Sequence, residues 1–119
     1  MHGTTRSRTA DHPAATGINA VVWIEPGRAV VVRGGASGEL ASMELPIPSV
    51  PALTPSALAE VAHSIGEVDR VLILGQDDLR TALEREIVAI GHRPEIIREA
   101  EVEGPLDEAA LVARLAHLR

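Results

Sequence analysis

The chain lacks several side chains on which whole classes of function depend. Its 119 residues include no cysteine, lysine, phenylalanine or tyrosine, and Trp23 is its only aromatic residue. Without cysteine it forms no disulfide and carries no thiolate chemistry. Without lysine it has neither a Schiff-base amine nor a phosphate-loop lysine. A single aromatic ring is too few for the stacking platforms that bind flat cofactors or single-stranded nucleic acid, so we expect no cofactor.

Long apolar runs are also missing. No segment of the sequence is apolar over the length that a bilayer requires. Residues 1–17 contain two arginines but no hydrophobic stretch of the kind found in secretory signals. The net charge of −6 disfavours nonspecific binding to DNA, which depends on many phosphate contacts. These absences predict a cytoplasmic protein that binds neither DNA nor a membrane.

The remaining composition predicts one folded domain. Residues 1–17 are polar and show no periodicity, which indicates a disordered tail. Residues 18–119 form a single α/β domain, because 45% of the chain is hydrophobic and its length suits one core. A proline-rich linker interrupts this domain over residues 46–55, where three prolines disfavour regular structure: Pro46, Pro48 and Pro51.

Runs of β-branched residues predict the strands. Residues 20–24 and 29–32 flank Pro26-Gly27, which predicts an N-terminal β-hairpin. Pro-Gly favours a type II turn, so we expect a connection wider than two residues. A flexible break follows over 34–38. Three further strands are expected over 39–45, over 71–74 and from Ile96.

Three segments have helical periodicity. Thr54 as N-cap and Gly66 as terminator bound the first, whose apolar face comprises Leu58, Val61, Ala62 and Ile65. Asp77 or Asp78 caps the second, which carries the stripe Leu79, Leu83, Ile87 and Ile90 and ends at Gly91 as a left-handed C-cap. The third begins at Pro105 and Asp107, with Leu111, Leu115 and Leu118 facing inward. Together these elements predict a three-layer α/β sandwich with a mixed sheet of four to five strands.

The unit from Asp69 to Arg98 marks the candidate site. It combines a buried strand, a tight turn at Gly75, two acids and a helix, and α/β proteins place their working surface where strands end. Asp77 and Asp78 supply too few ligands to enclose a metal ion. Their negative charges would also repel a phosphate, and the turn contains only one glycine. Helix capping is therefore the favoured interpretation of the two acids. The scattered histidines have no neighbouring nucleophile and acid, so no catalytic or metal-binding residue is expected.

Two motifs stand out, WIEPGRA at residues 23–29 and LILGQDDLR at residues 72–80. Both resemble the third, C-terminal domain of archaeal and eukaryotic class I release factors and Pelota, and especially the bacterial relatives of those proteins. Residues 23–29, WIEPGRA, match a family pattern Trp-Ile-Asp-His-Arg-Glu-Ala in a hydrophobic hairpin. Residues 72–80, LILGQDDLR, match Leu-Ile-Val-Gly-Pro-Gly-Glu-Ala-Lys before a helix. The resemblance extends over residues 19–118.

The resemblance implies a fold similar to ribosomal proteins of the L7Ae/L30e type and a domain that docks on partners and on the ribosome. Gly75-Gln76-Asp77-Asp78 lies where kink-turn RNA binders of this type carry Gly-x-Asn-Glu, but the Asn-Glu pair and a following lysine are absent. The Gly-Gly-Gln motif that releases peptides belongs to another domain, and here Gly34-Gly35 precedes alanine. The implied partner-binding residues are Gly75, Gln76, Asp77, Asp78, Arg80, Trp23 and Arg28.

Three hypotheses for the function remain open. The preferred one is a non-catalytic binding module that docks on the ribosome or on a translation-related protein, and Trp23 is either an interface anchor or a core residue in it. The second is a small α/β ligand-binding or enzymatic protein with its site at Gly75–Asp78. The third is a homodimer that pairs the free edges of the hairpin at 19–33. Two interpretations of the arginines are open. Arg28, Arg33, Arg80 and Arg85 either form a patch that contacts RNA or belong to a solvated face on which they pair with Glu84 and Glu86, and the solvated face is favoured.

Overall fold

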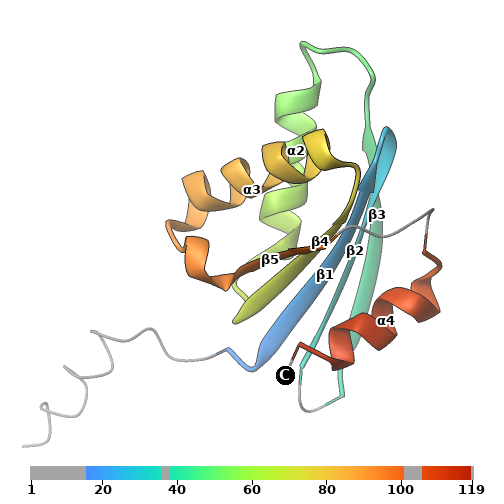
Figure 1. Cartoon of the computed structure of the whole chain (residues 1–119), viewed down its shortest axis with the longest axis vertical. Helices are drawn as coiled ribbons and strands as arrows, with labels where there is room; N and C mark the ends of the chain where they lie inside the picture. Colours follow the sequence, from blue (N-terminus) through green and yellow to red (C-terminus); the bar gives the residue numbers. More distant parts are fainter. Residues whose placement is uncertain (1–15, 36–37, 101–105, 119) are drawn as a thin grey trace, which may run out of the picture.

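A computed structural model describes residues 16–35, 38–100 and 106–118. Five strands form one sheet in the order β3-β2-β1-β4-β5 (Figure 1). β1 pairs antiparallel with β2 and parallel with β4, so the sheet is mixed. The elements are β1 (Ile18–Glu25), β2 (Gly27–Gly35), β3 (Leu40–Ile47), α2 (Thr54–Ile65), β4 (Arg70–Gly75), α3 (Asp77–Gly91), the 3-10 turn η1 (Pro94–Ile96), β5 (Ile97–Ala100) and α4 (Glu108–Ala116).

Helices cover both faces of the sheet, which confirms the predicted three-layer α/β sandwich. On one face, Ala20, Val22 and Ile24 of β1 belong to a core cluster with α2 and α3. On the other face, Val21 and Trp23 pack with Leu111 and Leu115 of α4. Figure 1 shows α4 on the opposite side of the sheet from α2 and α3. Because β1 is buried between two helical layers, its sequence is a continuous apolar run rather than an alternating one.

The hairpin turn is tighter than expected. Glu25 is paired with Arg28, so only Pro26 and Gly27 connect the two strands. Gly27 has φ +102°, a backbone conformation that glycine adopts without steric cost. The predicted wider connection is therefore wrong, because the positive φ at glycine accommodates the reversal within two residues.

The sheet order also contradicts a homodimer through the hairpin edge. β1 lies between β2 and β4, and β2 lies between β1 and β3. Both strands of the hairpin therefore already have a hydrogen-bonded neighbour on each side. Among the described residues, the outer strands of this sheet are β3 and β5.

The segment before α2 is shorter than the linker predicted over 46–55. β3 continues through Pro46 to Ile47, because an outer strand tolerates a residue without an N–H group. α2 begins at Thr54, with Leu53 at the N-cap position. The Thr54 hydroxyl does not cap the helix but donates to the carbonyl oxygens of Pro48 and Val50, both at 3.1 Å.

Some residues of the predicted break and of the predicted tail belong to the described structure of the domain. Gly34 and Gly35 belong to β2, whereas residues 36–37 lie outside the described part of the chain. Of the predicted disordered tail, residues 1–15 lie outside it as well. The backbone N–H groups of Thr16 and Gly17 donate to the carboxylate of Asp69 at 2.7 and 3.0 Å, so these two residues are fastened to the domain.

The buried helix faces agree with the sequence better than the helix ends do. Leu58, Val61, Ala62 and Ile65 are all buried, and Asp107 caps α4 by accepting from the N–H of Ala110 at 2.8 Å. In α3, Gln76 occupies the N-cap position and Asp77 and Asp78 stand in the first turn, so neither acid is the cap. The left-handed residue at its other end is His92, with φ +57°, instead of Gly91. Ile90, the last member of the predicted stripe of α3, is exposed. Pro105 is outside the described residues.

None of the helices in the described ranges is both long and apolar enough to cross a membrane.

Candidate functional site

The candidate site lies where β1 and β4 end side by side. Gly75, the last residue of β4, is paired with Ile24 of β1 and has φ +122°. A Cβ atom at Gly75 would collide with the carbonyl oxygen of Ile24, so the close approach of the two strands requires glycine. The next residue, Gln76, donates its N–H to the same oxygen at 3.1 Å. The turn into α3 is thus hydrogen-bonded to the end of the central strand β1.

The first turn of α3 presents an acidic, solvent-exposed surface. Gln76, Asp77 and Asp78 are all exposed, and the Gln76 carbonyl oxygen accepts the first helical hydrogen bond, from Arg80 at 2.8 Å. The exposed N–H groups and the dipole at a helix N-terminus stabilise carboxylates in this turn. The two acids therefore favour the helix without capping it.

Arg80 is buried beneath this turn rather than displayed on it. Only 8% of the residue is exposed. Its guanidinium forms an ion pair with Asp77 and lies 3.8 Å from Oε1 of Glu99 on β5. The arginine therefore links the start of α3, through Asp77, to Glu99 on the outer strand.

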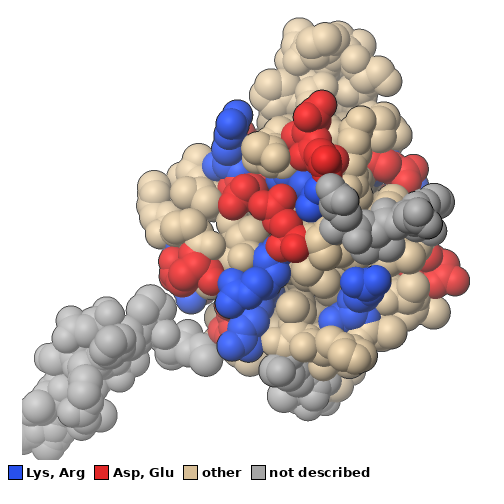
Figure 2. Space-filling view, viewed as in Figure 1, with Lys and Arg blue, Asp and Glu red and all other residues tan. Residues whose placement is uncertain are grey.

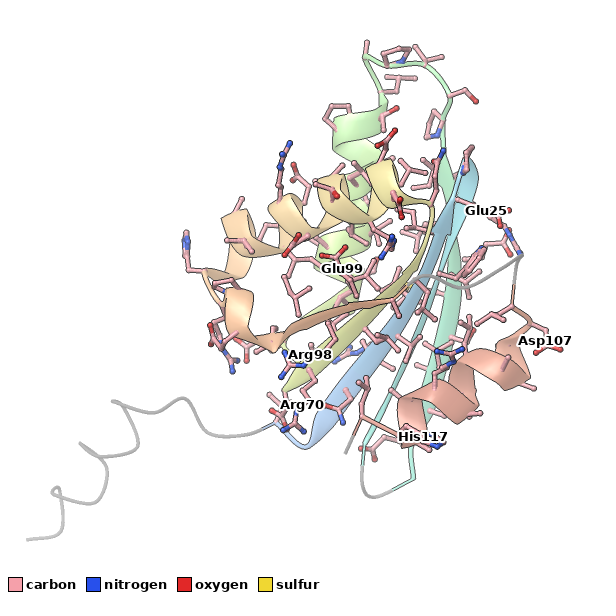
Figure 3. The ribbon with its side chains drawn as sticks, viewed as in Figure 1. Glu25, Arg70, Arg98, Glu99, Asp107 and His117 are labelled. Atoms are coloured by element: carbon pink, nitrogen blue, oxygen red, sulfur yellow. The ribbon has the colours of Figure 1, made fainter. Side chains whose placement is uncertain are left out.

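Glu99 completes a small acidic cluster around this arginine. Burial raises the pKa of the Glu99 carboxyl, and a hydrogen bond with Glu84 and the negative charge of Glu84 raise it further. The positive charge of Arg80 opposes these effects. Figure 3 labels Glu99 on β5 beneath α3, and Figure 2 shows acidic atoms gathered in one patch in the middle of the same view, directly above a stripe of basic atoms. The surface around the start of α3 is therefore dominated by carboxylates.

The two remaining predicted partner-binding residues lie on the other face of the sheet. Trp23 is 4% exposed in the core beneath α4, and its indole N–H donates to Oε1 of Glu25 at 2.6 Å. Arg28 forms ion pairs with Glu25 and Glu44, both at 3.4 Å. The structure thus brings Gly75, Gln76, Asp77, Asp78 and Arg80 together but separates them from Trp23 and Arg28. It also separates Arg28 from Arg80, so these two do not share one basic patch.

Sequence reasoning missed Glu99 and Asn19. Glu99 is 19 residues from Arg80, and nothing in the local pattern of β5 indicates a contact with α3. Asn19 is a stronger case, because a lone polar side chain at the start of the apolar run INAVVWI is a signal that could have been noticed. No group of three or more histidine, aspartate or glutamate side chains within the described ranges is arranged to hold a metal ion.

Comparison with known proteins finds similarity in structure only. No model of a known protein family matches the sequence, and no curated protein sequence matches it. The structure is similar to Archaeoglobus fulgidus Pelota, with a TM-score of 0.60 and 13% identity over 96% of this chain. It is similar to Saccharomyces cerevisiae Dom34, a translation termination-like factor, with a TM-score of 0.59 and 8% identity over 95% of this chain. It is also similar to the archaeal translation termination factor aRF1, with a TM-score of 0.54 and 10% identity over 84% of this chain.

The matched region is a part of each of these proteins. The chain corresponds to 35% of the Pelota structure, 36% of Dom34 and 34% of aRF1, so it spans about a third of their length. Identities this low establish the fold and nothing finer. The chain has the α/β fold of a release-factor-like domain, as found in Pelota, Dom34 and aRF1.

Proposed function

We propose that this chain is a non-catalytic binding module, comparable to the third domain of release factors and Pelota, that docks in the cytoplasm on the ribosome or on a translation-related protein. The observation that carries the proposal is the shared fold, which extends over 96% of the chain in the comparison with Pelota. Dom34, which has the same fold in part of its structure, is described as interacting with Hbs1. A protein partner is therefore the kind of ligand that this proposal assigns to the chain.

The first turn of α3 is the docking surface in this proposal. Gln76 and Asp78 are exposed there, on a helix that Gly75 and Arg80 hold against the sheet. Carboxylates around this turn repel nucleic acid phosphates and attract basic side chains. The surface thus suits a basic protein better than the RNA backbone.

A pair of charge reversals tests this surface. Asp78 and Glu108 are both exposed acids in the first turn of a helix, but α3 and α4 lie on opposite faces of the sheet. Asp78→Arg and Glu108→Arg therefore lose the same interaction with a helix dipole, about 0.3–1 kcal/mol. In sedimentation with purified ribosomes at low salt, we expect Asp78→Arg to weaken binding about tenfold, as for the loss of one favourable interfacial charge. Glu108→Arg should bind as the unmodified chain does.

The ribosomal form of the proposal fails if the unmodified chain stays in the supernatant at every salt concentration. The α3 surface is the wrong one if both variants bind equally well, or if Glu108→Arg is the weaker binder. In the absence of ribosome binding, affinity purification of the tagged chain from a cytoplasmic extract, with Asp78→Arg as the matched bait, decides whether a translation protein is captured through α3.

The small-molecule alternative at Gly75–Asp78 is not supported in the same way. Cavities lined by Asn19, by His63 and by Met43 all lie away from these four residues.

A further inference from the structure

A cavity lies on the α4 face of the sheet, at the opposite end of β1 from the hairpin turn. Its volume is about 360 Å³, within the range of small-molecule sites. Figure 3 labels Arg70 and His117 at this end of the domain and Glu25 at the other. Its location separates it from the α3 surface proposed above as the docking site.

Four residues from four neighbouring strands form the floor of this cavity. Strand register places Leu40 of β3 beside Gly34 of β2, Gly34 beside Asn19 of β1, and Asn19 beside Arg70 of β4. All four line the cavity, as do Leu115 and Ala116 near the end of α4. A Cβ atom at Gly34 would come within 3.2 Å of Leu115 and 2.8 Å of the carbonyl oxygen of Glu39. Glycine at this position therefore leaves the floor open beneath the helix.

Asn19 is the unusual member of the floor. It is 91% buried, because only 9% of the residue is exposed, and its Oδ1 atom has no hydrogen-bond partner among the described residues. A buried polar group without a partner is costly, and native structures generally satisfy such groups with protein, water or ligand. The Oδ1 atom is itself shielded from solvent, so a ligand in the cavity reaches it only after rotation about the terminal torsion, which is broad for asparagine. A ligand edge with both a donor and an acceptor would satisfy this carboxamide.

The charges around the cavity argue against an anionic ligand. Arg70 supplies one positive charge, but Asp69 and Glu39 supply two negative ones. Asp69 already accepts from Thr16 and Gly17, and Arg70 donates to the carbonyl oxygen of Leu118 at 3.0 Å. A carboxylate or phosphate would face a net negative lining, whereas a neutral ligand would not be repelled.

We propose that this cavity is a binding site for a small neutral molecule whose planar edge carries an adjacent donor and acceptor, namely a carboxamide or a nucleobase. Asn19 is the residue that recognises this edge, since asparagine pairs with such edges through two hydrogen bonds. Leu40, Leu115 and the bare backbone at Gly34 supply the apolar contacts around it.

The composition of the chain makes this proposal easy to test by NMR. The sequence contains one asparagine and one glutamine, so a ¹⁵N-labelled sample gives only two pairs of carboxamide NH₂ signals. Asn19 reports on the cavity, and Gln76 reports on the start of α3. The probes are adenosine, uridine and N-acetylglycinamide, with AMP and inorganic phosphate as anionic contrasts. We expect at least one neutral probe to shift the Asn19 signals in a saturable manner, with the Gln76 signals unmoved and with phosphate inactive.

A near-isosteric variant separates recognition from folding. Asn19→Leu removes the unpaired carboxamide, so we expect an unchanged or higher melting temperature together with affinity reduced by about tenfold or more for the active probe. Thr81→Val, which replaces an exposed polar side chain on α3, should change neither property.

Three results would overturn the proposal: no neutral probe shifts Asn19 more than Gln76, only AMP or phosphate does so, or Asn19→Leu retains full affinity. The first of these would leave bound water as the partner of Asn19. The titration of the unmodified chain decides the question even where the variant fails to fold.

Discussion

The backbone N–H of Gln76 donates a 3.1 Å hydrogen bond to the carbonyl oxygen of Ile24, which joins the start of α3 to the end of the central strand. A Cβ atom at Gly75, the residue before Gln76, would collide with this carbonyl oxygen, so the contact requires glycine there. The position of the exposed acids in the first turn of α3 therefore depends on a backbone contact beneath them.

Replacing Gly75 should be among the most damaging single changes in the domain. In Gly75→Ala the new Cβ meets the carbonyl oxygen of Ile24, and alanine is strained at φ +122°. We expect a loss of about 3 kcal/mol in the free energy of unfolding, measured by urea denaturation. Gly91→Ala is the matched control, because its Cβ meets nothing within 4 Å at the end of α3. It should be neutral or stabilise by up to about 1 kcal/mol, and equal effects of the two changes would contradict the contact.

The two core clusters should be distinguishable by fluorescence. Leu111 and Leu83 are both fully buried, but Leu111 packs in the cluster with Trp23 and Leu83 in the cluster on the other face. Either leucine changed to alanine should cost about 3 kcal/mol. Since Trp23 is the only fluorophore of its kind, Leu111→Ala should shift its emission to longer wavelength in the folded state, whereas Leu83→Ala should leave the emission unchanged. A shift in both variants would indicate that a cavity on either face of the sheet changes the environment of Trp23.

Glu99 should make the domain less stable as the pH rises. Its folded-state pKa lies above the ordinary glutamate value because of burial and of Glu84, so the folded state holds its proton to higher pH than the unfolded state does. Stability from this group is complete below the ordinary glutamate pKa and is lost as the pH rises through the raised one. Glu99→Gln should therefore stabilise the domain near pH 7, by no more than about 1 kcal/mol for a partly exposed group. The difference should vanish below the ordinary glutamate pKa, which thermal melts across pH would show. A stabilisation independent of pH would contradict this origin.

Asp69 should make the domain less stable as the pH falls, which is the opposite pH dependence to that of Glu99. Hydrogen bonds from the backbone of Thr16, and then of Gly17, hold the pKa of its carboxyl below the ordinary value, with burial acting against them. The stability that it contributes is present above the ordinary aspartate pKa and is lost as the pH falls through the lowered one. Asp69→Asn should cost less than about 1 kcal/mol at pH 7, because the site is solvent-screened. Parallel acid titrations of the two proteins should converge at low pH, and failure to converge would show that the lost contact is not ionic.

Local features of the chain were sufficient for the sequence to predict its elements and its layers. The stripe Leu58, Val61, Ala62 and Ile65 identified the buried face of α2 because helical periodicity depends only on nearby residues. The same reasoning failed at helix ends, where His92 instead of Gly91 is left-handed and where Gln76 precedes both acids. Those outcomes depend on how the helix meets the sheet, which propensity does not encode.

The candidate site was predictable only in its continuous part. Gly75 to Asp78 lie together in the chain, so a strand followed by a helix was enough to place them at the end of a sheet. The placement of Trp23 and Arg28 could not be predicted, because it depends on which face of the sheet each strand position occupies. The register of the hairpin, in which Glu25 is paired with Arg28, determines that face.

What the sequence by itself determined was therefore the set of elements, the absence of thiol and lysine chemistry, and the strand–glycine–acid–helix unit. Only the tertiary structure decided that Arg80 is buried against Glu99, that both hairpin edges are occupied, and that Asn19 borders a cavity beside Gly34 and Arg70. The physical reason is that strand order and register join residues far apart in the chain, and these long-range pairings determine which polar groups lose water and which gain a partner.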